Sequence, residues 1–130
     1  MDIKGKTVVV EKSAKEVFAF FTDLKNFKEI MPENTQKFEV DGDSFIFGLP
    51  GMPEIRLVLK EKTEYSNVTL GAASSKLNFE LVANIKEIDA TSSEVQLDFN
   101  GEFNAMMAMM VKKPLTSFIE TLTDNLEGLS

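Results

Sequence analysis

The chain has 130 residues, enough for one domain with a substantial core, and its hydrophobic (43%) and charged (27%) fractions are ordinary for a globular protein. Fourteen basic residues against 21 acidic ones give a net charge of −7, which argues against binding to nucleic acid and to anionic lipid. The absence of cysteine excludes disulfides and thiolate chemistry, and the absence of histidine removes the commonest general base and metal ligand.

The aromatic content is unusual, with eleven phenylalanines, one tyrosine and no tryptophan. Phenylalanine carries no hydrogen-bonding group, so this composition favours an apolar interior over a polar recognition surface. The first residues contain no apolar signal-peptide core, and no apolar run is long enough to cross a bilayer. We therefore expect a cytoplasmic protein without membrane insertion.

The start of the chain predicts a strand followed by two short helices. Residues 7–13 are rich in β-branched side chains, which is typical of a strand. Ser13 and, three residues later, Glu16 match a capping box that begins the first helix. Asp23 can cap the second helix, and Pro32 ends it.

After the second helix, apolar residues alternate with polar ones, which indicates strands with one buried face. Asp41-Gly42 marks a hairpin turn, and Pro50-Gly51-Met52-Pro53 must be a loop. Ile88 breaks the alternation of the clearest strand, which indicates a bulge or the end of that strand. We predict an antiparallel meander of six strands, at residues 35–41, 45–49, 55–62, 67–72, 77–86 and 94–100.

Residues 104–129 predict one long amphipathic helix, with Asn104 as its N-cap and Gly128 as its stop. Pro114 removes one helical hydrogen bond, and we expect it to bend the helix axis. Apolar residues at spacings of three and four define the face that packs on the sheet. These residues are Val111, Leu115, Phe118, Ile119, Leu122 and Leu126.

Four methionines occupy the first turns of this helix: Met106, Met107, Met109 and Met110. Successive residues lie about 100° apart around a helix, so the four cannot all share the packing face. Three interpretations remain open. The methionines are ordinary core that fills irregular gaps, or they line a cavity or its entrance, or they form a surface for a protein partner or a second copy.

A strongly curved sheet has more concave apolar surface than two short helices can cover, so the long helix must fill the concavity. Where filling is incomplete, a hollow for an apolar ligand remains between helix and sheet. The candidate wall residues are Phe45, Phe47, Leu57, Leu59, Leu70, Phe79, Leu81, Leu97 and Phe99. Met52 is a candidate for the mouth of this cavity, and the four helix methionines are candidates for its upper part or gate.

The opening of the chain resembles a known superfamily. Ser13-Ala14-Lys15-Glu16-Val17-Phe18, followed by Asp23, Phe27 and Met31-Pro32, is similar to the opening of the START-like, or birch-pollen-allergen-like, helix-grip proteins. This superfamily (SRPBCC) includes polyketide cyclases and lipid-transport domains. The resemblance covers nearly the whole chain in its order of elements. The family often has a tryptophan near Phe27, and this chain has none, so no subfamily is selected.

The resemblance and the order of elements predict an α+β helix-grip fold. A curved antiparallel sheet of about seven strands, in the order β-α-α-β-β-β-β-β-β-α, should wrap around the long C-terminal helix. The resemblance further implies an apolar cavity between helix and sheet for a lipid, a polyketide or another hydrophobic small molecule. Some members of the superfamily catalyse cyclisation or dehydration, and many only bind or carry their ligand.

The residues themselves predict no catalytic or metal site. No calcium-binding loop, glycine-rich phosphate loop or Gly-x-Ser-x-Gly motif occurs, and Asp41-Gly42-Asp43 is explained by the hairpin turn. Arg56, the only arginine, alternates away from the apolar face of its strand, where we expect a surface salt bridge. Tyr65 falls in a predicted turn.

We therefore predict a single domain over residues 1–130 that binds or carries a hydrophobic small molecule or lipid without catalysis and without a cofactor. We expect a monomer or weak homodimer with no nucleic-acid partner. Two alternatives remain. A cyclase- or dehydratase-like enzyme needs an ionisable group inside the cavity, and a protein-interaction or homodimer module would use the methionine cluster.

Overall fold

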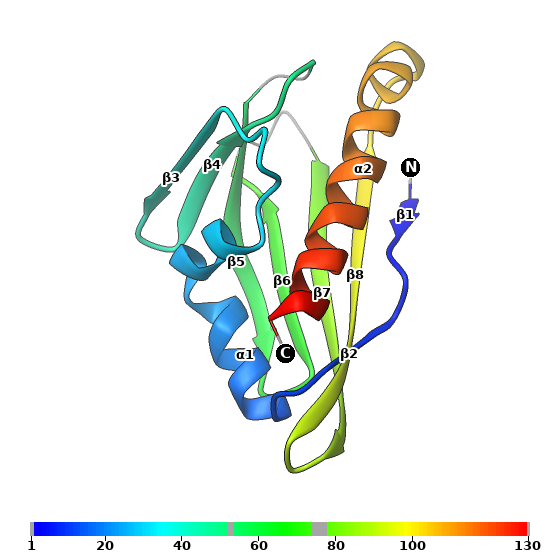
Figure 1. Cartoon of the computed structure of the whole chain (residues 1–130). Helices are drawn as coiled ribbons and strands as arrows, with labels where there is room; N and C mark the ends of the chain where they lie inside the picture. Colours follow the sequence, from blue (N-terminus) through cyan, green and yellow to red (C-terminus); the bar gives the residue numbers. More distant parts are fainter. Residues whose placement is uncertain (1, 52–53, 74–77, 130) are drawn as a thin grey trace.

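The computed structural model describes residues 2–51, 54–73 and 78–129. An antiparallel sheet curves around the long helix α2 (Ala105–Gly128), as Figure 1 shows. The helix α1 (Ala14–Thr22) and the 3₁₀ helix η1 (Leu24–Glu29) cover one end of the sheet's concave face. This architecture confirms the predicted α+β fold, in which a curved sheet grips a C-terminal helix.

The sheet has eight strands in the order β1-β8-β7-β6-β5-β4-β3, with β2 also paired to β8. The strands are β1 (Asp2–Lys4), β2 (Val8–Val10), β3 (Lys37–Asp41), β4 (Ser44–Gly48), β5 (Ile55–Thr63), β6 (Asn67–Ala72), β7 (Asn78–Asp89) and β8 (Ser92–Glu102). The consecutive strands β3 to β8 form the predicted six-stranded meander. The sheet exceeds the expected seven strands because β1 and β2 both pair with β8.

The N-terminal segment differs from the prediction, because β2 is only three residues long and β1 precedes it. Gly5 lies between these strands, and its N–H donates to the Leu97 carbonyl oxygen at 2.7 Å. A Cβ at Gly5 would lie 2.7 Å from that same oxygen, so only glycine lets the chain pass this close to β8. The three residues of β1 are too few to show a periodic pattern, which is why the sequence did not reveal it.

The capping signals of the two short helices are confirmed. The Glu16 N–H donates to Ser13 Oγ at 3.1 Å, and the Ser13 N–H donates to Glu16 Oε1 at 3.3 Å, which together make the capping box. Asp23 Oδ1 accepts from the Lys25 N–H at 3.3 Å and begins η1. The second helix is therefore where the sequence placed it, although it is a 3₁₀ helix.

The turn and bulge signals are also confirmed. Gly42 adopts φ = 60° in the hairpin between β3 and β4. The pairing of β7 with β8 shifts register between Glu87 and Asp89, at the position of Ile88. The predicted loop residues Met52 and Pro53 and the predicted strand residue Leu77 lie outside the described residues.

The part of α2 from Val111 onward buries the predicted apolar stripe. Asn104 Oδ1 accepts from the Met107 N–H at 2.8 Å, so Asn104 is the N-cap. The helix continues through Pro114 and buries all six stripe residues. The predicted stop is wrong by one residue, because Gly128 is the last helical residue and Leu129, in a right-handed conformation, is the C-cap. No helix of the described residues is long and apolar enough to cross a membrane.

Candidate functional site: a groove beside the long helix

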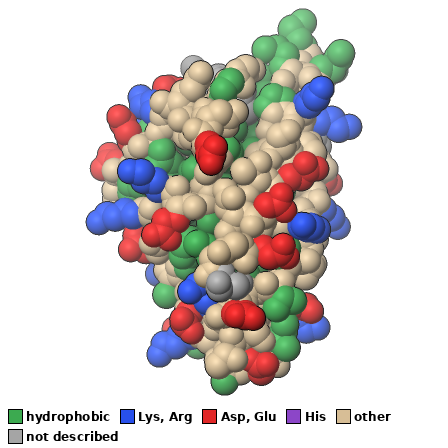
Figure 2. Space-filling view, viewed as in Figure 1, with side chains coloured by type: hydrophobic (Ala, Val, Ile, Leu, Met, Phe, Trp, Pro, Cys, Tyr) green, Lys and Arg blue, Asp and Glu red, His purple; other side chains and the backbone are tan. Residues whose placement is uncertain are grey.

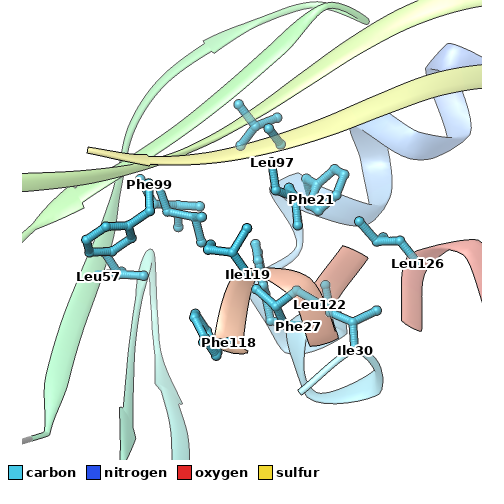
Figure 3. Close-up of a cluster of buried hydrophobic side chains, with 14 of the residues drawn as sticks. Phe21, Phe27, Ile30, Leu57, Leu97, Phe99, Phe118, Ile119, Leu122 and Leu126 are labelled. Carbon is cyan, nitrogen blue, oxygen red and sulfur yellow. The ribbon is translucent and has the colours of Figure 1, made fainter. Parts of the chain in front are cut away.

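Aromatic side chains fill the space between α2 and the concave face of the sheet. Phe47 of β4 stacks on Phe118 of α2, with ring centroids 4.8 Å apart and an interplanar angle of 9°. Phe45, also of β4, stacks on Phe27 of η1 at 5.0 Å. Figure 3 shows side chains of the sheet, the short helices and α2 converging in this region. A side chain that borders a void large enough for water has some surface that a water molecule can touch. Phe45 and Phe47 have none (0% exposed), so no such void lies beside them.

The predicted wall residues all lie in or against this core. Leu59 is partly buried, and the other eight are buried: Phe45, Phe47, Leu57, Leu70, Phe79, Leu81, Leu97 and Phe99. In this conformation they contact one another rather than an open cavity, and their contact with a ligand stays a prediction. Met52, the candidate for the mouth, lies outside the described residues.

The four methionines lie in two different environments. Met107 is partly buried and packs against the core, whereas Met106, Met109 and Met110 are 75%, 83% and 56% exposed. Val111 is the first fully buried residue of α2. The interpretation of the methionines as ordinary core therefore holds only for Met107. The other three belong to a projecting, solvent-exposed part of the helix.

A surface groove of about 280 Å³ runs along α2, close to the lower size limit of small-molecule sites at roughly 300 Å³. The helix contributes Lys113, Pro114, Ser117, Phe118 and Thr121, and the facing wall contributes Pro32, Asn34, Leu49 and Pro50. Phe118 connects this groove with the interior, because its ring both lines the groove and stacks on Phe47. Met110 lies one turn above Lys113 and Pro114, on the same side of the helix.

Hydrogen bonds fix the wall opposite the helix. The carbonyl oxygen of Pro32 accepts from the Thr35 N–H at 3.1 Å and from Thr35 Oγ1 at 2.6 Å, which closes the turn that contains Asn34. Two residues before Pro32, the carbonyl oxygen of Ile30 accepts from Asn125 Nδ2 of α2 at 2.8 Å. This bond ties the lower half of α2 to the segment that forms the groove wall.

The start of α2 is fixed in a different way. Phe103 folds back over Gly101 and stacks on Phe79, with ring centroids 6.3 Å apart. A Cβ at Gly101 would overlap with the Phe103 ring, so a larger residue at this position would displace that ring from its stack on Phe79. The two turns between Phe103 and Val111 contain no buried residue. This part of the helix is therefore held at its ends and packs only partly in between.

A second groove, of about 390 Å³, lies between the N-terminal segment and α2. Lys6 and Asp124 both line it and form an ion pair at 3.2 Å, and hydrogen bonding and charge from Asp124 raise the pKa of Lys6. Both side chains are more than 60% exposed, so the pair contributes little to stability. No ring of the aromatic core lines this groove, which makes it the weaker candidate.

Among the described residues, three polar side chains are buried, and each is a bonded hydroxyl; Oδ1 of the partly buried Asp98 is a further buried polar atom, without a partner in the described part of the chain. The partners of the hydroxyls are Asn67 Oδ1 for Thr69 Oγ1, the Lys12 carbonyl for Ser93 Oγ and the Ile119 carbonyl for Thr123 Oγ1, each at 2.8 Å. The other pKa shift concerns the exposed carboxyl of Asp89, whose pKa is lowered by the Thr91 N–H. No cluster of acidic residues suited to a metal ion occurs in the described part of the chain.

Two residues considered in the sequence lie away from the groove. Arg56 is exposed, as predicted, but its Nη1 donates to Ser44 Oγ at 3.0 Å, a hydroxyl partner instead of the expected carboxylate. Tyr65 lies in the turn between β5 and β6 with φ = 64°, and its ring meets Phe18 edge-on at 5.7 Å.

Most of the residues that line the groove were not predicted from the sequence. Pro32, Asn34, Leu49 and Pro50 lie in connections between elements, where no periodic pattern marks a shared surface. The helix side left a weak signal. The small polar residues Ser117 and Thr121 flank the apolar stripe beside Phe118, and such residues leave space next to a packing face.

Several solved structures share this fold at low sequence identity. The solution structure of the KanY protein matches with a TM-score of 0.76 at 11% identity, covering 99% of this chain and 96% of KanY. Norcoclaurine synthase from Thalictrum flavum, in complex with dopamine and hydroxybenzaldehyde, matches with a TM-score of 0.72 at 13% identity, covering 99% of this chain and 85% of the synthase. XoxI from Bacillus cereus matches with a TM-score of 0.68 at 12% identity, covering 98% and 94%.

No protein-family model and no curated protein sequence matches the chain. The structural matches, together with the curved sheet and the gripped helix, nevertheless define the class of fold. The chain has a helix-grip fold, the fold that the resemblance at its opening predicted.

Proposed function

We propose that this protein binds or carries a hydrophobic small molecule or lipid, without catalysis, through the groove beside α2. The observation that carries the proposal is the double position of Phe118, which lines the groove and also closes the aromatic interior by stacking on Phe47. A rotation of this one ring would join the groove to the space that the wall residues now fill. The expected cytoplasmic location is part of this proposal.

The packing of α2 supports an entry route at the same place. The helix is anchored from Val111 onward by buried residues and by the hydrogen bond from Asn125 to Ile30. The turns between Phe103 and Val111 bury no residue completely. A small outward movement of the upper turns would therefore disrupt little packing. Met110, directly above the groove, is placed to contact a ligand with a flexible apolar side chain.

The chemistry of the groove indicates the kind of ligand. Binding would be driven by burial of apolar surface, at about 25 cal/mol per Å² before entropic costs. The groove rim adds the polar side chains of Asn34, Ser117 and Thr121 and the charge of Lys113. A molecule with an apolar body and a polar or anionic end fits both parts.

The enzyme alternative receives less support. Norcoclaurine synthase is an enzyme of this fold that was crystallised with two aromatic small molecules. A cyclase or dehydratase needs an ionisable group at the reacting atoms. The buried polar side chains of the described residues are three hydroxyls that already have partners. The buried carboxylate oxygen of Asp98 lies on the face of β8 opposite Leu97 and Phe99, outside the aromatic interior, and both observations favour binding without catalysis.

The first test is native mass spectrometry of freshly purified protein, followed by organic extraction of any molecule that travels with it. The second test measures the affinity of the protein for Nile red, a fluorescent apolar probe. Ser117→Trp should fill the groove and weaken probe binding at least tenfold, with the free energy of unfolding unchanged within about 0.5 kcal/mol because Ser117 is exposed.

The matched control is Glu127→Trp, at an exposed position of the same helix outside the groove. This variant should bind Nile red as the parent protein does. If Ser117→Trp left probe binding unchanged, the groove would not be the entry route. A dimer mass without any small molecule would instead favour the interaction module.

A further inference from the structure

The exposed methionines form an apolar patch at the tip of α2. Met106, Met109 and Met110 follow the spacing i, i+3, i+4, so they share one side of the helix, opposite the packing stripe. Figure 2 shows hydrophobic side chains at the tip of the projecting helix and basic side chains directly below them. We call these three residues the methionine tip.

The charge around the tip differs from that of the whole molecule. Residues 105–119 contain Lys112 and Lys113, both exposed, and no carboxylate, whereas the three acidic residues of α2 all follow from Glu120 onward. Glu120 lies ten residues after Met110, the nearest residue of the tip, or about 15 Å along the helix at ~1.5 Å per residue. This distance is nearly two Debye lengths of about 8 Å, so those carboxylates are largely screened from the tip.

Three carboxylates of the sheet lie closer to the start of α2: Asp2, Glu80 and Glu102 line one pocket at the ends of β1, β7 and β8. Glu102 precedes the N-cap of α2 by two residues, and its Oε2 accepts from Asn78 Nδ2 at 3.1 Å. These carboxylates belong to the sheet, whereas the projecting helix segment carries only Lys112 and Lys113 and the positive end of the helix dipole. The helix that bears the tip is therefore basic along residues 105–119, on a protein whose net charge is −7.

A basic, apolar projection fits an anionic lipid surface better than it fits a protein. A standard protein interface needs roughly 20–30 residues on each side, whereas the tip offers three methionines and two lysines. A second copy fits poorly as well, because a two-fold contact through the same patch would bring the lysine pairs of two negatively charged molecules together. A bilayer needs no complementary shape, since its lipids rearrange around a small apolar projection.

We propose that the methionine tip docks on anionic lipid surfaces, with its side chains in the apolar boundary and Lys112 and Lys113 at the headgroup phosphates. Three to four residues separate Met109 from the lysines, which is about 4.5–6 Å of helix and reaches the shallow end of the ~5–10 Å depth to which apolar faces enter the interface. The contact is peripheral and needs no membrane-spanning segment. It goes beyond the proposed function, because it requires no ligand in the groove.

The test is co-sedimentation of the protein with large vesicles of phosphatidylcholine, alone or mixed with phosphatidylserine, at low and high salt. The protein should bind the mixed vesicles at low salt and lose binding at high salt. Lys112→Gln/Lys113→Gln should lower binding about 25-fold, at about fivefold for each lysine. The control Lys25→Gln/Lys28→Gln makes the same change of net charge at exposed positions of η1 and should bind normally.

The apolar part of the contact is tested by Met106→Ser/Met109→Ser, with Ile88→Ser as the control at another exposed apolar residue. The methionine variant should fold normally and bind mixed vesicles at least tenfold more weakly, and the control should not differ from the parent. The proposal is overturned by a parent protein that binds mixed vesicles no better than phosphatidylcholine alone. It is also overturned by a dimer in solution that the methionine substitutions dissociate. Nile red binding tests the groove separately from either result.

Discussion

Replacing Phe118 by alanine tests the link between the groove and the interior. Phe118 is 1% exposed and stacks on Phe47 at 4.8 Å, so its removal loses both the burial of a large side chain and a ring contact. Substitutions of this kind cost about 3–5 kcal/mol, of which ring stacking supplies about 0.5–1.5 kcal/mol. A domain of this size has about 5–15 kcal/mol of stability, so we expect Phe118→Ala to fold with a much reduced margin.

The assay combines urea denaturation with the binding of a small aromatic probe, benzene. Phe118→Ala should lower the midpoint of unfolding without changing the slope. It should also bind benzene, because the new cavity, on the order of 100 Å³, would open into the groove. Binding is measured as added stability, which rises with the ratio of ligand concentration to dissociation constant.

Phe99→Ala is the matched control. Phe99 is fully buried and stacks on Phe79 at 5.7 Å, but it does not line the groove. We expect a similar loss of stability and a similar stabilisation by benzene, but slower exchange of bound benzene measured by NMR, because a closed cavity is reached only when the protein opens transiently. Equal exchange rates in the two variants would refute the groove as the route to the interior. A loss below about 1 kcal/mol in Phe118→Ala would refute the tight packing of the ring.

Three further substitutions test the upper end of the groove, the N-terminal segment and the outer face of the sheet. Met110→Lys should weaken Nile red binding while leaving the free energy of unfolding within about 0.5 kcal/mol of the parent, since Met110 is 56% exposed; equal loss of both would mean that the residue supports the fold. Gly5→Ala should cost about 1–3 kcal/mol in urea denaturation, because the new Cβ would meet the Leu97 carbonyl oxygen. Asn84→Ala should cost about 1–3 kcal/mol at neutral pH, because Asp98 Oδ2 loses its donor at 3.1 Å while the buried Oδ1 has no partner among the described residues; an unchanged midpoint would contradict this account.

The sequence predicted those features that depend on local or periodic signals. The capping box at Ser13, the glycine turn at Gly42 and the bulge at Ile88 each follow from a few neighbouring residues. The buried stripe of α2 follows from a spacing repeated over four turns. These signals were sufficient for the fold because each strand carries its own alternation and the order of elements then permits few arrangements.

The groove and the exposure of the methionines could not be predicted in the same way. Pro32 and Leu49 are distant in sequence and meet beside α2 only because the meander and η1 bring their connections to one side of the helix. The four methionines have the same side chain and lie around the helix, so the sequence does not indicate which of them are buried. Their environments depend on where the helix axis leaves the sheet. That path is set by Phe103 on Phe79 at one end and by Val111 at the other.

The division of α2 explains how one helix can serve two proposed roles. From Val111 onward it is a structural element, because its apolar face is buried. In the two turns before Val111, Met107 faces the core and Met109 faces solvent. Met110 belongs both to the methionine tip and to the position above the groove, whereas Met106 and Met109 belong to the tip alone. Substitution of Met106 and Met109 therefore tests the lipid contact alone, and substitution of Ser117 tests the groove alone.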